Sequence, residues 1–373
     1  MNILHIYKDY YPVLGGVENH VRLVAEAQAA RGHTVAVLVT GPHPRTRVEQ
    51  RNGVRVIYAG RLATVASTPL SLSLPLRLWR ERPEIAHLHY PYPVGDVAYA
   101  LFGRGRRTVI SYHSDIVRQK SLLRLYAPWL RRSLARADAV LATSPRYVET
   151  SPFLRPLAER CTVVPYGIQS ERFAQADPAA VAAIRQAHGG VPLLLFVGQL
   201  RYYKGVEFLI RAMRHVPGAL VLLAGGESSA RRAALESLAQ TEGVAERVVF
   251  LGEQDEQLPA LYHACEMFVL PSIERSEAFA IVQLEAMAAG RPVVSCDVGT
   301  GVAWVNQHGS TGLVVPPRDP QALAAAINGL LADPALRAQM GAAGRARVAA
   351  HFTQARMLAD IEAVYKRVLR RPA

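Results

Sequence analysis

The chain has 373 residues, 50% of them hydrophobic and 20% charged, which suits two globular domains of ordinary size and excludes a disordered chain. The net charge of +13 is uneven, because residues 1–170 hold 23 Lys and Arg against 11 Asp and Glu, while residues 171–373 hold 20 against 19. The basic half points to a polyanionic ligand, anionic lipid or nucleic acid.

The chain contains neither a disulfide framework nor a zinc motif, since Cys161, Cys265 and Cys296 are scattered. No apolar run approaches the length needed to span a bilayer. The start of the chain enters a strand pattern and soon reaches Lys8 and Asp9, unlike a signal peptide. We therefore expect a cytoplasmic protein of a reducing compartment.

Apolar, β-branched runs alternate with helical patterns along the chain, which is typical of an α/β fold with parallel sheets. The first strand candidates are 2–7, 34–40, 54–58, 84–89, 108–112, 138–143 and 161–164, and the clearest helix is 17–31. The pattern restarts at 193–198, 219–224, 247–251, 267–270, 292–295 and 312–315, before a closing helix at about 354–370. The sequence predicts two doubly wound, Rossmann-like domains, 1–175 and 176–373.

The turn after the first strand contains Gly15-Gly16, directly before the first helix. Paired glycines let the backbone approach a ligand and leave N–H groups for an anion. The turn is not Gly-x-Gly-x-x-Gly, and no acidic residue follows at the distance expected for a dinucleotide ribose. An ordinary glycine turn is the alternative.

His113 follows another strand of the first domain. At the carboxyl end of a strand, an imidazole could bond a sugar hydroxyl or assist proton transfer. His87 and His89 alternate on the preceding strand and are weaker candidates, because most of the twelve histidines are expected to be structural or exposed.

The segment Arg118–Arg136 is basic and amphipathic, with no acidic residue from Ile116 through Ala137. Such a helix could lie on an anionic membrane surface, or it could pack one face on the core and leave a solvated basic face. We expect Pro128 to kink the helix or split it in two.

The second domain opens with a strand that ends at Gly198, followed by Arg201 and Lys204 on the loop. Doubly wound sheets bind ligands at the carboxyl ends of their strands. Either cation alone could be a solvated loop charge. As a pair, they favour a diphosphate site that neutralises charge on a departing nucleoside diphosphate.

Glu277 and Glu285 stand eight positions apart after the apolar run 268–272. We expect Glu277 on the loop before a helix, Glu285 about two turns along that helix, and free amides between them for a phosphate. Two acids around an anion cradle suit a nucleotide sugar, with its hexose, diphosphate and ribose. An exposed Glu followed by a solvated helical Glu is the alternative. No metal-binding or Walker-type motif occurs, which fits metal-independent chemistry.

In their order and spacing, these features resemble the retaining, GT-B-fold glycosyltransferases of glycosyltransferase family 4. The resemblance spans nearly the whole chain and rests on Gly15-Gly16, His113, the loop 199–205, the run 268–272, Glu277 with Glu285, and 311–317. It implies two domains facing an interdomain cleft, with the acceptor on domain 1–175 and the nucleotide sugar on domain 176–373. It also implies that the last helix, about 354–370, packs back on the first domain.

The resemblance also assigns roles to single residues. Glu277 would hold the donor sugar, and Glu285 would bind the ribose diol. The remaining contacts would come from the amides of Phe279, Ala280 and Ile281 beside the sugar, Arg201 and Lys204 on the diphosphate, Gly15 and Gly16 approaching it, and His113 on the sugar.

The chain departs from the family pattern in several places. Gln199 stands where arginine is frequent, and Ala278-Phe279-Ala280 replaces Gly-Phe-Gly. Because alanine restricts φ where glycine would be free, we expect that this loop cannot adopt strongly positive φ without a cost in free energy. The loop from Ser272 to Glu277 is also longer than is common.

The implied reaction moves a hexose with retention, without cofactor or metal ion. Similarity to bacterial polysaccharide enzymes favours GDP-mannose as donor and a polyprenyl-diphosphate-linked glycan of O-antigen, capsule or exopolysaccharide assembly as acceptor, at the inner face of the cytoplasmic membrane. A UDP-hexose is the rival donor. The other classes are a GT-B-fold sugar-nucleotide epimerase, a nicotinamide-dependent dehydrogenase, and a non-catalytic glycan- or nucleic-acid-binding protein. A non-catalytic binding protein is disfavoured because the four candidate site residues are intact, namely Arg201, Lys204, Glu277 and Glu285. We therefore expect no nucleic-acid partner.

Overall fold

The computed structural model describes residues 1–11, 13, 15–65, 68–117 and 120–372, which form two compact units. Unit 1 comprises Met1–Val164 with Leu358–Ala373, and unit 2 comprises Pro165–Met357. Each unit is a doubly wound α/β body, so the predicted fold class is confirmed. The assignment of acceptor to 1–175 and donor to 176–373 stays a prediction.

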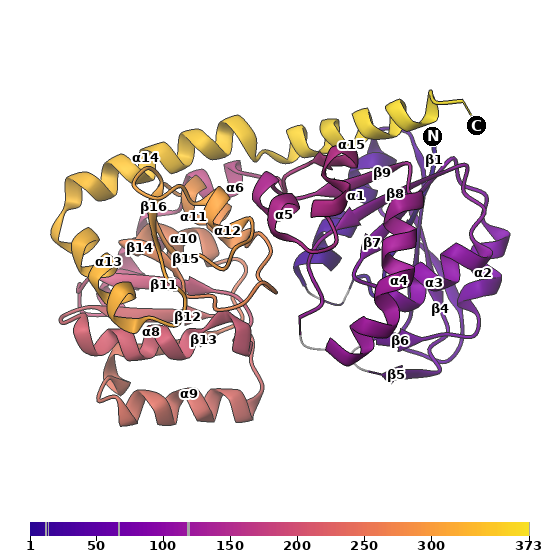
Figure 1. The fold of residues 1–373 in the computed structure, drawn as a ribbon. Helices are drawn as coiled ribbons and strands as arrows, with labels where there is room; N and C mark the ends of the chain where they lie inside the picture. Colours follow the sequence, from indigo (N-terminus) through magenta and orange to yellow (C-terminus); the bar gives the residue numbers. More distant parts are fainter. Residues whose placement is uncertain (12, 14, 66–67, 118–119, 373) are drawn as a thin grey trace. The chain divides into compact units, whose positions relative to one another are not determined.

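Unit 1 is built on an eight-stranded sheet in the order β10-β9-β8-β7-β1-β2-β4-β3 (Figure 1). All seven predicted runs form parallel strands. The strands are β1 (Asn2–Ile6), β2 (Thr34–Thr40), β3 (Arg47–Arg51), β4 (Val54–Ala59), β7 (Ile85–Tyr90), β8 (Arg107–Tyr112), β9 (Ala139–Ala142) and β10 (Cys161–Val163). The sequence did not predict β3, which pairs antiparallel at the edge and is largely exposed, nor the small ribbon of β5 (Ala63–Val65) and β6 (Thr68–Leu70).

The helices of unit 1 include one long basic helix near the middle of the chain. They are α1 (Gly16–Ala30), α2 (Leu74–Arg80), α3 (Pro93–Phe102), α4 (Lys120–Arg136), α5 (Pro145–Thr150) and the 3-10 segment Arg155–Arg160. Of the two outcomes predicted at Pro128, the split is wrong, because α4 runs through this residue, and the kink stays a prediction. Pro128 and Arg124 are both exposed, so water can bond the Arg124 carbonyl that Pro128 leaves without an amide donor. Arg118, where the predicted basic segment begins, lies outside the described residues.

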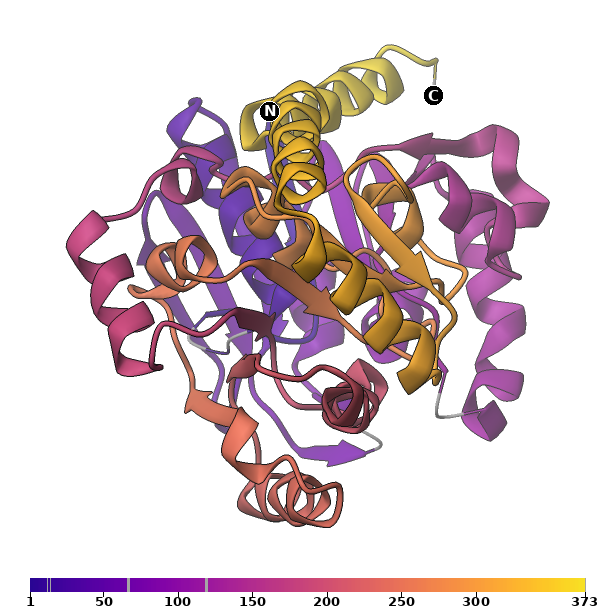
Figure 2. The same ribbon diagram turned by 90° about the vertical axis from the view of Figure 1, so that its left-hand side faces the viewer.

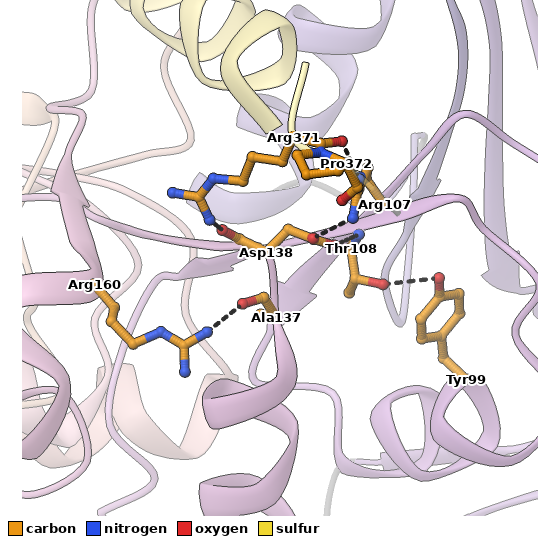
Figure 3. Close-up of polar contacts among 8 residues, drawn as sticks. All are labelled: Tyr99, Arg107, Thr108, Ala137, Asp138, Arg160, Arg371 and Pro372. Carbon is orange, nitrogen blue, oxygen red and sulfur yellow. Dashed lines mark hydrogen bonds and ion pairs between the residues drawn. The ribbon is translucent and has the colours of Figure 1, made fainter. Parts of the chain in front are cut away.

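The last helix, α15 (Gln354–Leu369), belongs to unit 1 from Leu358 onward, as predicted. Its buried Tyr365 hydroxyl lies 2.5 Å from His87 Nδ1 on β7. Beyond the helix, Arg107 Nη2 donates to the carbonyl oxygens of Arg371 (2.5 Å) and Pro372 (2.7 Å), and Arg107 Nη1 pairs with Asp138 at 3.2 Å (Figure 3). These contacts fasten the end of the chain at the amino ends of β8 and β9.

Unit 2 is built on a six-stranded parallel sheet in the order β13-β12-β11-β14-β15-β16, and all six predicted runs form strands. The strands are β11 (Leu193–Val197), β12 (Leu220–Ala224), β13 (Val248–Gly252), β14 (Met267–Leu270), β15 (Val293–Cys296) and β16 (Gly312–Val315). The hydrophobic core of unit 2 includes Leu194, Phe196 and Val221. These short runs read as apolar because both faces of the sheet are covered.

Helices cover both faces of the unit 2 sheet, with α8 and α9 on one side and α10 and α11 on the other (Figure 1). Figure 2 shows α9 again at the lower edge of the unit. The helices are α6 (Glu171–Ala174), α7 (Pro178–Ala187), α8 (Val206–Ala212), α9 (Ser229–Thr241), α10 (Leu258–Ala264), α11 (Val282–Ala288), α12 (Val302–Val305), α13 (Pro320–Ala332) and α14 (Pro334–His351). Across the described parts of both units, no helix has the length and apolar content that crossing a membrane requires.

Candidate active site

The switch point of unit 2 lies between β11 and β14, where the strand order reverses. In doubly wound sheets, the loops that leave the carboxyl edge at this point form the ligand site. The loop after β11 contains Arg201 and the 3-10 turn Tyr202–Lys204, and the loop after β14 contains Ser272 and Glu277. The fold therefore brings the predicted cations and the first predicted acid to one edge.

Lys204 and Glu277 form a buried ion pair, with 2.5 Å between Lys204 Nζ and Glu277 Oε2. The same oxygen accepts a 3.1 Å hydrogen bond from Ser272 Oγ, and Thr300 Oγ1 donates to the Glu277 carbonyl at 2.6 Å. Burial acts to lower the pKa of the Lys204 ammonium, but Glu277 and Tyr203 outweigh it and the net pKa is raised. Lys204 is therefore a fixed cation at neutral pH. The contacts from Ser272 and Thr300 were not predicted from the sequence.

Gly205 explains why the two loops approach so closely. It has φ +66°, and a Cβ there would overlap the carbonyl oxygen of Pro271 after β14. Gly198 has φ +141°, and a Cβ there would make only an ordinary contact, 3.5 Å, with Lys204 Nζ. Both glycines stand in the Gly198–Gly205 segment that the sequence singled out, and both conformations favour glycine.

Arg201 lies beside Lys204 but is exposed, so it can turn toward a ligand. Tyr203, which the sequence analysis missed, connects the two cations. Burial and then Glu277 raise the pKa of Tyr203, whereas Lys204, Arg201 and a hydrogen bond with Arg201 lower it. Arg201, Lys204 and Glu277 therefore all lie close to Tyr203.

The loop 278–281 adopts a positive φ at one alanine, although this conformation is costly for alanine. Ala280 has φ +59°, and Ile281 follows in the right-handed helical region. When a residue in the left-handed conformation is followed by one in the right-handed conformation, neighbouring backbone N–H groups converge. They then form a concavity that binds anions. Within the described residues, the amides of Phe279, Ala280 and Ile281 donate to no protein acceptor. Ala280 adopts this conformation despite its expected cost, as an anion-binding turn requires.

Replacing Ala280 by glycine is expected to raise the free energy of unfolding by about 0.5–1 kcal/mol, since glycine relieves the left-handed strain of about 1–2 kcal/mol at some cost in unfolded-chain entropy. Urea unfolding of the full chain measures the change. Ala278→Gly, two residues earlier and without positive φ, should instead lower stability. Equal effects of the two substitutions would contradict this account of the loop.

Glu285 lies in the first turn of α11 rather than about two turns along a helix. The prediction was wrong because the left-handed Ala280 delays the start of α11 to Val282. Glu285 Oε2 accepts a 2.9 Å hydrogen bond from the Tyr262 hydroxyl of α10. Burial raises the pKa of Glu285, while the Tyr262 bond opposes this shift. Glu285 is a half-buried acceptor, not a solvated helical charge.

In unit 1, Gly15 caps α1 and Gly16 begins it. A Cβ at Gly15 would overlap the Glu18 carboxylate, which turns back toward the start of its own helix and lies 3.6 Å from Lys8 Nζ. A Cβ at Gly16 would meet nothing within 4 Å. The paired glycines thus differ: Gly15 makes room for Glu18, and only Gly16 leaves open space.

His113 lies just beyond β8, only 3% exposed, and its Nε2 is 2.9 Å from His89 Nδ1. Burial lowers its pKa well below the ordinary value, so the ring is neutral. His87, His89, His5 and His20 are also buried around it. From the sequence, His87 and His89 were only weak candidates, and His5 and His20 were missed. The clustering of these histidines depends on the pairing of β1 with β7 and on the position of α1.

Two family models match the chain. The model described as "Glycosyltransferase Family 4" matches residues 14–172, and the model described as "Glycosyl transferases group 1" matches residues 182–347. Together they cover every predicted site residue and every strand described above except β1.

The chain is similar to proteins of known name over nearly its whole length. It is 37% identical to the O-antigen chain mannosyltransferase C of Escherichia coli, over 96% of both chains, and 35% identical to the D-rhamnosyltransferase WbpZ of Pseudomonas aeruginosa, over 95% of this chain and 92% of that one. Sucrose-phosphate synthase from Thermosynechococcus elongatus has a similar structure, with a TM-score of 0.81, 26% identity and 98% coverage of both chains. HepE of Anabaena, solved in complex with UDP, shares the fold with a TM-score of 0.79 at 20% identity, over 98% of this chain and 100% of that chain.

Proposed function

Because the chain belongs to glycosyltransferase family 4, a family of retaining, nucleotide-sugar-dependent enzymes, we propose that it transfers a hexose to a hydroxyl of a lipid-linked or growing cell-surface glycan. The leading donor is GDP-mannose. This choice is supported by the relatives named for transfer of mannose and D-rhamnose, since D-rhamnose is the 6-deoxy form of mannose. A UDP-hexose remains the alternative donor.

The observation that carries the proposal is the Lys204–Glu277 ion pair at the switch point of unit 2. A fixed buried cation, the exposed Arg201 beside it and the amides of the 279–281 loop together supply what a diphosphate needs. Glu277 contacts Lys204 and Ser272 through Oε2, so Oε1 is the atom we assign to hydroxyls of the donor sugar. Glu285, which already accepts one hydrogen bond, is assigned to the ribose diol.

In the proposed reaction, the bond between the sugar C1 and the diphosphate oxygen breaks while the acceptor hydroxyl forms its bond on the same face. The departing phosphate oxygen takes the hydroxyl proton, so no carboxylate nucleophile is required. Arg201 and Lys204 stabilise the negative charge that develops on the nucleoside diphosphate, which is the role that a metal ion plays in other enzymes. We assign a contact with the donor sugar to His113. We assign to Gly15 and Gly16 the close approach of the first domain's backbone to the diphosphate.

The donor proposal is tested by thermal unfolding of the full chain with GDP, UDP or ADP at equal concentration. A ligand that binds only the native state adds about 2.7 kcal/mol of stability at 100 times its Kd. We expect GDP to raise the Tm most and EDTA to leave that shift unchanged. A larger shift with UDP would move the proposal to a UDP-hexose. The absence of any shift would refute a nucleotide-sugar site.

Transfer itself is followed with isotopically labelled GDP-mannose and a polyprenyl-diphosphate-linked oligosaccharide. An α-linked product detected by NMR supports retention from the α-linked donor, and a β-linked product would contradict it. Uptake of deuterium from D2O into the sugar nucleotide without acceptor would instead indicate an epimerase.

The surface of α4 supports a peripheral contact with anionic membranes. Leu130 and Leu134 are buried, whereas Leu122, Leu125 and Trp129 are exposed by 52%, 78% and 41%. This exposed apolar stripe is flanked by the basic residues Arg124, Arg131 and Arg132. Core packing alone therefore explains one face of α4, and the exposed stripe with its basic flanks suits a membrane interface.

Replacing Leu125 by glutamate is expected to reduce co-sedimentation with phosphatidylglycerol vesicles several-fold, and added salt should reduce pelleting of the wild-type chain. Leu101→Glu on α3 is the matched control, because Leu101 is 61% exposed outside this stripe. Arg131→Ala/Arg132→Ala should act like Leu125→Glu. Unchanged pelleting of these two variants, or an equal loss with Leu101→Glu, would refute the contact.

A further inference from the structure

The ring of Phe279 is surrounded by three other aromatic side chains of unit 2, which we call the aromatic cage: Tyr166, Trp304 and Phe352. The Phe279 and Tyr166 rings lie edge to face, with centroids 5.1 Å apart and an interplanar angle of 87°. Phe352 meets Phe279 in the same way, at 6.0 Å and 79°, and Trp304 lies tilted at 6.5 Å. Aromatic pairs prefer edge-to-face packing of this kind. The Phe279 ring therefore has a defined place, although its backbone belongs to a loop.

The cage itself is fixed by contacts between segments far apart in the sequence. The rings of Trp304 and Phe352 pack edge to face at 5.5 Å, and the Arg347 guanidinium of α14 lies over both of them. Arg347 also donates to the carbonyl oxygen of Trp304 at 2.9 Å. Two residues beyond Tyr166, the Ile168 amide donates to the Phe352 carbonyl at 2.9 Å. These contacts restrain the cage, so it can hold Phe279 in place.

The three peptide groups from Ala278 to Ile281 form the turn whose amides we assign to the diphosphate. The carbonyl oxygens of these peptides all accept hydrogen bonds: Ala278 from Gly301 N at 2.9 Å, Phe279 from Gln283 Nε2 at 3.0 Å, and Ala280 from Gln283 N at 3.0 Å. In a trans peptide, the N–H points away from the C=O. Because each carbonyl is turned toward the protein, each amide is turned toward the ligand.

This arrangement of the turn needs support from its surroundings. Ala280 is left-handed, with φ +59°, and a strained residue of this kind persists only where the rest of the structure imposes it. Phe279 precedes Ala280, and its Cα atom is shared by the first two peptides of the turn. A side chain that fixes this atom, together with the bond from Gln283 to the Phe279 carbonyl, limits how both peptides can rotate.

We propose that Phe279 is a positioning residue: its caged ring holds the peptide groups of the turn so that their amides face the diphosphate. The ring is only 2% exposed, so it acts through the backbone and not by stacking on the substrate. This inference rests on the proposed function for the identity of the ligand. The restraint on the turn does not depend on that identity.

A purely structural role of Phe279 is the competing explanation, because any buried ring contributes to folding. The two roles differ in what a smaller side chain would change. Loss of packing alone lowers the stability of the chain but leaves the affinity of the folded molecule for an anion unchanged. Loss of positioning lowers that affinity even where the chain is fully folded.

Inorganic pyrophosphate is the probe that separates these roles, because it presents two linked phosphates without a base or a sugar. The full chain is labelled with ¹⁵N-isoleucine, the Ile281 amide signal is assigned with Ile281→Val, and pyrophosphate is titrated well below the Tm of each variant. We expect this signal to shift downfield and saturate in the wild-type chain. Phe279→Leu should weaken the affinity about tenfold, which corresponds to about 1.4 kcal/mol.

Tyr166→Leu and Tyr166→Phe test the cage, because both lack the hydroxyl and only the second keeps the ring. We expect Tyr166→Leu to weaken pyrophosphate binding about fivefold and Tyr166→Phe to stay within about twofold of the wild type. Phe250→Leu is the matched control, since the Phe250 ring of β13 packs on the core of unit 2 beneath Arg232. It should lower the Tm without changing the affinity.

Wild-type affinity in Phe279→Leu would overturn the proposal, as would equal losses in the two Tyr166 variants or a tenfold loss in Phe250→Leu. A wild-type Ile281 signal that does not respond to pyrophosphate would overturn it as well. In transfer assays, Phe279→Leu should lower kcat/KM for the donor about tenfold. The expected pyrophosphate affinities without any hexose transfer would refute the proposed function and leave the positioning role of Phe279 intact.

Discussion

Replacing Lys204 by methionine is expected to lower turnover by about one to three orders of magnitude, equivalent to roughly 1.4–4 kcal/mol of lost transition-state stabilisation. Methionine keeps the length of the side chain but removes the cation that we assign to the departing diphosphate. Initial rates with GDP-mannose measure the loss. Turnover like that of the wild type would refute the leaving-group role.

The same substitution also affects folding, because it leaves the Glu277 carboxylate buried without its cation. Removing one member of a buried pair costs about 3–5 kcal/mol. The double variant Lys204→Met/Glu277→Gln should recover most of that stability without recovering turnover. Arg214→Met/Glu242→Gln is the matched control, since that 3.1 Å pair has an Arg214 side chain 58% exposed and should contribute little to either quantity.

Replacing Glu277 by glutamine is expected to reduce turnover by a similar one to three orders of magnitude, equivalent to roughly 1.4–4 kcal/mol, because a charged group at the reacting centre is lost. Glutamine preserves the shape but weakens both the contact with Lys204 and the acceptor assigned to the sugar. Kinetics with the full chain give kcat and KM separately, and we expect most of the loss in kcat.

Glu274→Gln is the control for Glu277, because Glu274 lies on the same loop and bonds the Tyr202 hydroxyl at 3.0 Å. It should change turnover little. If Glu274→Gln were as damaging as Glu277→Gln, general disruption of the loop would explain both results, and the assigned contact with the sugar would lose its support.

The sequence predicted the architecture well because both sheets are buried on two faces. Strands such as Leu193–Val197 are then continuous apolar runs with glycine or proline near their ends. Edge elements such as Arg47–Arg51 were missed since their polar residues carry no such pattern. The split at Pro128 was wrongly predicted because tolerance of proline in a helix depends on solvent exposure, which a single sequence does not state.

The candidate site was predictable as positions along the chain but not as contacts. Loops that follow the first and fourth strands of a doubly wound sheet meet at one edge, so Lys204 and Glu277 could be placed near one another. Their direct ion pair, and the contacts from Ser272 and Tyr203, depend on the close loop approach at Gly205. The left-handed Ala280 could not be foreseen, since local propensity disfavours it and only the anion-binding turn accounts for it.

A crystal structure of the full chain with GDP tests the central claim most directly. The account predicts that the diphosphate contacts Lys204 Nζ and the amides of Phe279, Ala280 and Ile281, with the ribose hydroxyls on Glu285. A diphosphate bound away from the loops after β11 and β14, or Lys204 still paired with Glu277 alone while the nucleotide is bound, would contradict it.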